Sequence, residues 1–261
     1  MAGDAGLFGP ESVTWRIHGD PSMIIGGLRS LLVQSLNPRA MAGVDQHSDF
    51  RVDPWGRLER TGAYVAATTF GDTETAIAAG EMVKAVHRKV RGTDPHSGLA
   101  YSAGDHDLLA WVHDVEVHSF LVAYRRYGGT ISDVDADRYV AEMVRAAELV
   151  GLSPDEVPHD LGALRERLRA APIEISDAAM SAMRFILAPP MPAVARPLYA
   201  IPIAAAIHLL PRKVRRLYGL PWLPPVDPAV RLTTYSLLRA VNLVLPGPPA
   251  LREARARLAA A

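Results

Sequence analysis

Helix-start signals recur along this 261-residue chain and constrain its fold more than any other feature of the sequence. Asp20 and Asn37 each stand directly before a proline, which pairs a capping side chain with the residue best suited to a first helical turn. Asp72 and Ser132 offer the same capping chemistry before further helical segments. Alternating β-branched runs between tight turns, the signal of strands, are hard to find. The pattern predicts an all-α fold built as a helical bundle.

Caps and breakers divide the chain into segments. Expected helices cover residues 21–36, a short segment from 38, and residues 57–70, 72–91, 105–128 and 132–151, with a loop over 93–104. A chain of this length with 49% hydrophobic residues can bury a large core. We expect one α-helical domain over residues 1–261, with a proline-rich apolar C-terminal extension from about residue 172.

The composition limits the partners. The 28 Lys and Arg residues balance 28 Asp and Glu residues, so no overall field favours nucleic acid. The chain has no cysteine, so thiolate-ligated metal or haem sites are excluded and a bound metal needs nitrogen or oxygen ligands. The first residues lack the basic and apolar regions of a secretory signal, which predicts a cytoplasmic location. The sequence leaves a homo-oligomer open.

The segment from Asp107 to Gly129 is expected to form a mostly apolar helix with His113, Glu116 and His118 at its centre. At about 100° per residue, His113 and Glu116 share one side of this helix, whereas His118 lies about 140° from His113. The two histidines therefore cannot bind one metal ion as a compact pair.

Two interpretations of His113 stay open from the residues alone. A single histidine within an apolar wall can bind haem iron from the proximal side. A buried histidine can instead be structural, with its ring hydrogen-bonded to a carbonyl or to a carboxylate such as Glu116. The wall for the first interpretation would come from Leu109, Val112, Val117 and Phe120.

Two further polar groups lie on the helices before this one. One is a helix face that is either a solvated surface or the polar lining of a cofactor site, formed by Arg57, Arg60, Thr61 and Tyr64. The other is His87 with the basic helix end that reaches Arg91. Such an end is either solvated, as the helix macrodipole favours, or in contact with a carboxylate such as a haem propionate.

The last third of the chain is apolar and broken by prolines. Its uncharged run, residues 197–211, is shorter than the ~20 residues that span a bilayer, which favours helices buried against the core. Arginines and a lysine follow between residues 212 and 216. A hydrophobic face with a basic collar, resting on a membrane surface, is the alternative.

Three segments together resemble a known family: "GDPSMIIGGLRSLLVQSLNPRAMAGVDQHS", "GRLERTGAYVAATTFGD" and "VHRKVRGTDPHSGLAYSAGDHDLLAWVHDVEVHSFLVAYRRYGG". The chain is similar to the uncharacterised-domain family numbered 2236, which is related to the rubber (latex-clearing) oxygenases and to the fungal oxygenase that cleaves a prenyl chain in mycophenolic acid synthesis. The resemblance is dense over residues 17–151 and rests on proline-rich apolar texture in the C-terminal third.

The resemblance implies a globin-like helical core that holds one non-covalent haem b next to a hydrophobic channel. It makes His113, in the run Trp111 to His113, the proximal iron ligand. Arg57 to Thr61 matches in kind an Arg-x-x-Lys-Thr element on the distal side, but Arg60 replaces the lysine. A guanidinium stays protonated, so Arg60 can donate hydrogen bonds but should not coordinate iron.

The family's distal glutamate has no counterpart between Asn37 and Arg57. The polar candidates there are Asp45, His47 and Asp49, and the run from Gln46 to Ser48 is a candidate pocket lining.

The expected function is that of a haem b oxygenase or related oxidoreductase acting on dioxygen and a hydrophobic small molecule. The expected catalytic residues are Arg57, Arg60 and Thr61. The expected cofactor-binding residues, besides the iron ligand His113, are Tyr64, His87, Arg91, Trp111, Glu116 and Phe120. A haem carrier or sensor without turnover, and a helical protein that binds lipid or a membrane surface, are the alternatives.

Overall fold

The computed structural model describes residues 3–221, 226–244 and 247–260. These residues form thirteen α-helices. The helices are α1 (Val13–His18), α2 (Met23–Gln34), α3 (Pro38–His47), α4 (Pro54–Phe70), α5 (Thr73–His87), α6 (His106–Ala123), α7 (Asp133–Leu149), α8 (Leu161–Ala170), α9 (Asp177–Leu187), α10 (Arg196–His208), α11 (Arg212–Leu217), α12 (Asp227–Val244) and α13 (Pro249–Ala259). The all-α prediction is confirmed, whereas the globin-like arrangement stays a prediction.

Capping side chains start several helices where the sequence predicted. Asn37 accepts a hydrogen bond from the Ala40 backbone at 3.1 Å, and Ser132 accepts one from the Asp135 backbone at 3.0 Å. The expected cap at Asp20 was wrong by two residues, because α2 starts only at Met23 and the Asp20 carboxylate accepts from the Ser22 backbone at 2.8 Å. Local chemistry thus determines most helix starts.

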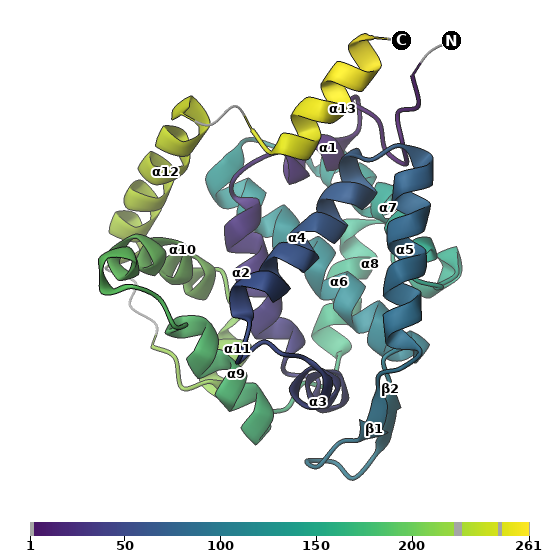
Figure 1. Ribbon diagram of the computed structural model, residues 1–261. Coiled ribbons are helices and arrows are strands. Elements are labelled where there is room, and N and C mark those ends of the chain that lie inside the picture. The colour runs from purple at the N-terminus through teal and green to yellow at the C-terminus, as the bar shows by residue number, and fades with distance from the viewer. Residues whose placement is uncertain (1–2, 222–225, 245–246, 261) are drawn as a thin grey trace.

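Two expectations between residues 72 and 104 were wrong. Helix α5 ends at His87 instead of reaching Arg91, and the expected loop contains a β-hairpin. Strands β1 (Arg91–Thr93) and β2 (Ala100–Ser102) pair in antiparallel register. The hairpin projects from one end of the molecule (Figure 1). Tertiary contacts stabilise it, since Gln46 on α3 donates to the Thr93 carbonyl at 3.1 Å and accepts from the Tyr101 hydroxyl at 2.7 Å.

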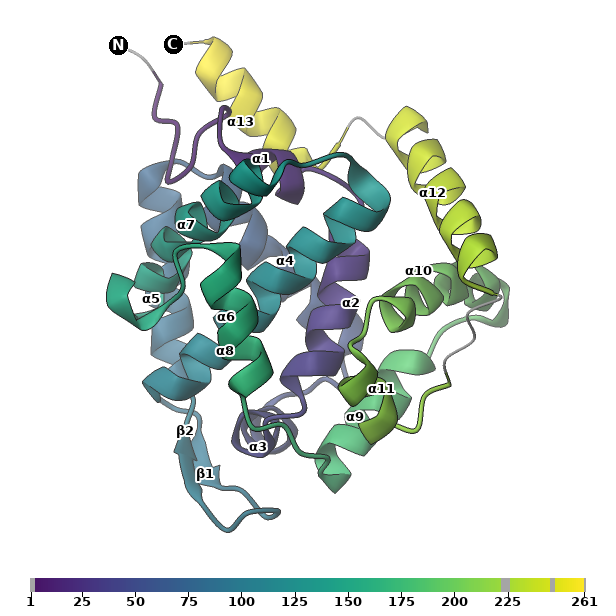
Figure 2. The same ribbon diagram turned by 180° about the vertical axis from the view of Figure 1, so that it is seen from behind.

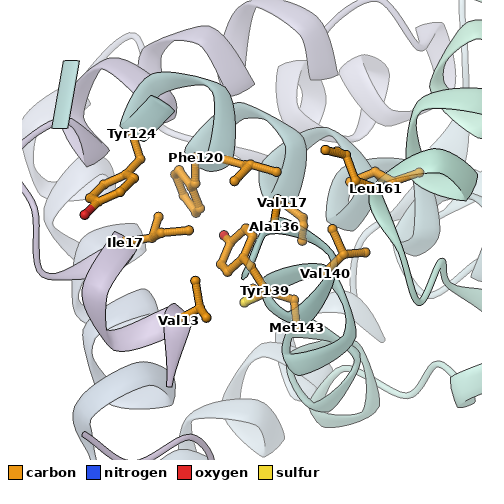
Figure 3. Packing of buried hydrophobic residues seen from close by; sticks show 12 residues of the cluster. Val13, Ile17, Val117, Phe120, Tyr124, Ala136, Tyr139, Val140, Met143 and Leu161 are labelled. Atoms are coloured by element: carbon orange, nitrogen blue, oxygen red, sulfur yellow. The ribbon is translucent and has the colours of Figure 1, made fainter. Parts of the chain in front are cut away.

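Helix α6 runs through the middle of the molecule and is packed on several sides. A cluster of buried side chains joins it to α1, α7 and α8 (Figure 3). Tyr139 of α7 is fully buried between Ile17 of α1 and Val117 of α6 (Figure 3). The π-helical turn η1 (Tyr124–Gly128) continues α6 and ends before Gly129, close to the predicted stop at Gly128. Packing on several sides fixes the rotation of α6, and with it the directions of its polar side chains.

Helix α2 packs closely against α6. A β-carbon added at Gly26 would lie 2.8 Å from Cδ1 and 3.0 Å from Cα of Phe120, so only a glycine fits there. More than two turns away, the indole nitrogen of Trp111 donates to the Gln34 carbonyl at 3.0 Å. Helix α2 therefore supports α6 along most of its own length.

The apolar C-terminal region folds back onto the core. Helix α10, which contains Pro202, packs beside α2, and α9 packs beside α3 (Figure 2). This agrees with the expectation of buried helices. Within the described residues, no helix combines the length and the apolar character needed to cross a bilayer. Contact with a membrane surface stays a prediction.

Candidate functional site

His113 and Glu116 lie on one side of α6, as the helical spacing predicted, and both are half-buried. Burial, assisted by the charge of Arg167, lowers the pKa of His113 to about 4, so its imidazole is neutral near pH 7. The ring makes no hydrogen bond to any residue in the described part of the chain. A structural histidine bonded to Glu116 is therefore not observed, and both ring nitrogens of His113 are available to a ligand.

Glu116 lies where three helices meet. Burial raises its pKa to about 7. Its charge in turn helps to raise the pKa of Tyr64 on α4 and of Tyr139 on α7, in addition to the larger effect of burial on each phenol. The carboxyl group thus faces α4 from α6, and the two helices cross in both views (Figures 1 and 2). Here α4 and α6 bring together groups that are far apart in sequence.

A buried polar network lies next to Glu116, and it was not predicted from the sequence. His18 is 6% exposed, and its Nδ1 lies 2.8 Å from Oγ1 of Thr69 while its Nε2 lies 3.0 Å from the Tyr139 hydroxyl. Burial lowers the pKa of His18 to about 3, so the ring is neutral. The network connects α1, α4 and α7, and it reaches the surroundings of Glu116 through Tyr139. A lone histidine after an apolar residue was the only available signal.

The polar face of α4 divides into a half-buried part and an exposed part. Arg57 is half-buried and donates from Nη1 to the Ser48 hydroxyl, and burial lowers its pKa. Tyr64 is half-buried as well. Arg60 is exposed and pairs with Asp53 at 3.2 Å, and the exposed Thr61 donates its hydroxyl proton to the Arg57 carbonyl at 3.0 Å. Arg57 and Tyr64 are thus the residues of this face that turn toward the interior.

The other expected cofactor residues are dispersed. His87 on α5 is half-buried, and its Nδ1 is buried without a hydrogen-bond partner. Phe120 is buried edge-on to His18, with ring centroids 5.2 Å apart. Trp111 points into the contact with α2. Arg91 lies on the exposed strand β1 and donates to the Arg88 carbonyl at 2.6 Å. Of the expected residues, Glu116 of α6 faces Tyr64 of α4. Arg91, in contrast, belongs to the hairpin.

The polar run at the end of α3 mostly holds other parts of the fold. Asp45 pairs with Arg51, and the His47 ring lies 3.2 Å from the Arg91 carbonyl. Only Ser48 contacts a residue of the α4 face, through Arg57. Of the two carboxylates of this run, Asp45 is held in an ion pair and Asp49 is exposed, so a counterpart of the distal glutamate stays a prediction.

An ion pair with one buried partner follows His113 on α6. Asp114 is 3% exposed, and its Oδ2 accepts from Nε of Arg167 at 2.9 Å, while its Oδ1 is buried without a partner. Burial raises the pKa of Asp114 to about 6 despite the opposing charge of Arg167. This pair holds α8 against α6 on the side next to His113. Asp114 and Arg167 lie on different helices and far apart in the sequence, so their pairing was not predicted.

The metal-binding capacity of the fold follows from these positions. The described residues contain no group of three or more His, Asp or Glu side chains able to hold a metal ion. His113 is a single, neutral, unpartnered imidazole, which is the donor that a haem iron takes from a protein on its proximal side.

The fold and these side chains define an all-α protein in which a neutral histidine and a proton-holding glutamic acid lie on one central helix, opposite a polar helix. The family model for "ER-bound oxygenase mpaB/B′/Rubber oxygenase, catalytic domain" matches residues 15–243. The chain belongs to this family of oxygenase catalytic domains, which confirms the resemblance to the rubber oxygenases and makes the chain an oxygenase. No curated protein and no solved structure matches the chain significantly.

Proposed function

We propose that this oxygenase depends on haem b, with His113 as the proximal iron ligand, and that it oxidises a hydrophobic substrate with dioxygen. The observation that carries the proposal is the state of His113: neutral near pH 7, half-buried on the central helix and without a hydrogen-bond partner among the described residues. A neutral imidazole without a protein partner leaves a ring nitrogen free to bind a ligand.

The neighbouring residues fit a haem. The wall around His113 on α6 includes buried apolar side chains such as Leu109, Val117 and Phe120, as a porphyrin requires. On α4, Arg57 supplies a half-buried guanidinium suited to a propionate or to negative charge on oxygen. The buried, unpartnered Nδ1 of His87 is a further donor or acceptor that a ligand group would satisfy.

When bound, haem would supply the activation of dioxygen. The chain's own residues would do the rest. His113 would hold the cofactor through a neutral nitrogen, and the apolar wall would exclude water and accommodate the substrate. Arg57 would donate hydrogen bonds to negative charge that develops on oxygen.

Glu116 would provide the proton-transfer group that the sequence lacks upstream of α4. Because its pKa is about 7, its carboxyl oxygen can hold or release a proton near neutral pH, the property that general acid–base catalysis requires. Tyr64 faces it from α4 and could pass a proton on.

The test compares His113→Ala with His118→Ala, which removes the other half-buried histidine of the same helix. Both variants and the wild type are expressed with haem supply, and their absorption spectra and oxygen uptake with an apolar alkene are recorded. We expect a Soret band in the wild type and in His118→Ala, and its loss or strong shift in His113→Ala.

Colourless wild-type protein that takes up no haem on titration would refute haem dependence. Equal spectra for all three proteins would refute His113 as the ligand. A Soret band without alkene-dependent oxygen uptake would favour the haem carrier or sensor over the proposed substrate class. Arg57→Gln should lower the oxidation rate by about 10²-fold, the usual effect of removing a positioned donor, while Arg60→Gln should leave it nearly unchanged.

A further inference from the structure

The side of α6 that faces away from His113 carries a second group of charged residues, which the proposed function does not use. His118 is five residues after His113, so it points about 140° away from it, between α2 and α8. In Figure 2, α8 lies in front of α6, and α2 packs against the same helix. His118 is half-buried, and its Nδ1 lies 3.3 Å from Nη2 of Arg29 on α2.

Arg29 is a buried cation whose partners are all neutral. Its side chain is 3% exposed, and its Nε donates to the Leu209 carbonyl at 3.1 Å. Its Nη1 donates to the Ser119 hydroxyl at 2.5 Å, and Nη2 donates to His118. No carboxylate of the described residues pairs with it. The Leu209 carbonyl ends α10 and so offers a partial negative charge, which offsets the guanidinium only in part.

The charges of three more arginines act on His118. Burial, together with the charges of Arg29, Arg165, Arg125 and Arg169, lowers the pKa of His118 to about 3. Arg165 and Arg169 lie one turn apart on α8, exposed, and pair with no carboxylate in the described part of the chain. The four arginines and His118 are called the arginine cluster below.

Among the described residues, a single carboxylate forms an ion pair with any of the four arginines of this cluster. Arg125 pairs with Asp133 at 2.8 Å, but the Asp133 side chain is 93% exposed, which weakens the compensation. The Nε of Arg125 is buried and makes no hydrogen bond. A local excess of positive charge is relieved by a bound anion.

The tautomer of His118 supports the same ligand. A guanidinium can only donate, so Nδ1 of His118 accepts from Arg29, and the proton of the neutral ring must sit on Nε2. His118 therefore offers an N–H donor. An oxygen-rich anion can accept from this N–H and from arginine forks at the same time.

We propose that Arg29, His118, Arg165 and Arg169 form a binding site for an oxyanion, a phosphate or carboxylate group, on the face of α6 opposite His113. Arg29 and His118 form its base, and the two exposed arginines of α8 reach over it. The site is separate from the haem ligand, so it stands whether or not the proposed cofactor binds.

The test is a titration of the full-length protein with inorganic phosphate, followed by NMR of ¹³C-labelled histidine and by calorimetry. The resonance of His118, assigned with His118→Gln, should shift and saturate, while that of the exposed His47 should not. The double variant Arg165→Gln/Arg169→Gln changes only exposed residues and should fold. It should weaken binding by about tenfold or more, equivalent to about 1.4 kcal/mol.

The matched control is Arg252→Gln/Arg255→Gln, which makes the same charge change at two exposed positions of α13. It should bind phosphate as the wild type does. Equal weakening in both double variants, or a His118 resonance that does not respond to phosphate, would overturn the proposal.

A second arm identifies the source of the oxyanion. Phosphatidylcholine vesicles with and without phosphatidic acid are mixed with the wild type and both double variants. Binding to the acidic vesicles that phosphate displaces, and that only Arg165→Gln/Arg169→Gln weakens, would support the site and assign it to a lipid headgroup. Phosphate binding without vesicle binding would support a soluble oxyanion.

Discussion

The close contact of α2 with α6 predicts that alanine at Gly26 and alanine at Gly27 change the stability of the protein differently. A methyl group added at Gly26 would sit 2.8 Å from Cδ1 of Phe120 and 3.0 Å from its Cα, whereas one added at Gly27 would meet no atom within 4 Å. Carbon atoms in contact prefer about 3.5–4.0 Å, so Gly26→Ala must push the two helices apart or displace the Phe120 ring.

The magnitude follows from two opposing effects. Replacing glycine by alanine inside a helix stabilises by about 1 kcal/mol at either position. Overpacking at Gly26 costs about 1–3 kcal/mol, because the clash includes the backbone of α6. The helix effect is common to both variants, so Gly26→Ala should be less stable than Gly27→Ala by about 1–3 kcal/mol.

The assay is urea unfolding of the wild type and both variants, with the free energy of unfolding compared at equal cofactor content. Gly27→Ala should equal or exceed the wild type in stability. If Gly26→Ala proves as stable as Gly27→Ala, then α2 and α6 do not pack at the observed distance, and the support of α2 for the histidine-bearing helix would have to be abandoned.

Three other predictions concern buried groups. His18 has a pKa of about 3 in the folded protein against about 6.5 in the unfolded chain, so the unfolded chain binds the proton first and stability falls as the pH drops below 6.5. Replacing His18 by Gln should remove about 2 kcal/mol of the stability that the wild type loses between pH 7 and pH 5. If the free energy of unfolding in urea depends on pH equally in both proteins, His18 is not buried as a neutral ring. Trp111→Ala should cost about 3–5 kcal/mol in thermal or urea unfolding, whereas the half-exposed Trp55→Ala should cost far less, and similar costs would contradict the core position of Trp111. Glu116→Gln should abolish the part of the pH–rate profile that titrates near pH 7, and a profile unchanged in shape would remove Glu116 from proton transfer.

The tertiary positions explain why sequence reasoning located some site residues and missed others. Arg57, Arg60, Thr61 and Tyr64 do share one helix face, but nothing in their spacing shows that only Arg57 and Tyr64 turn inward. That division depends on the elements that cover α4, which come from distant parts of the chain. The same holds for His18, whose partners are Thr69 and Tyr139.

The β-hairpin is an element that sequence reasoning missed because tertiary contacts form it. A stretch rich in glycine, serine and proline was expected to be a loop, and its local preference is indeed weak. Contacts from α3 decide the outcome, since Gln46 bonds to both Thr93 and Tyr101. A short strand pair with little propensity of its own can form when a neighbouring helix stabilises it.

The sequence by itself determined the helical class, most helix starts and the side of the central helix on which His113 and Glu116 lie, because caps and a period of about 3.6 residues act within a few positions of the chain. Only the tertiary structure decided that Glu116 faces Tyr64, that Asp114 pairs with Arg167 and that Arg29 is buried beside His118. Those relations join residues dozens of positions apart, and packing of whole helices sets them. The electrostatic environment that shifts the pKa values of these groups exists only once the helices have assembled.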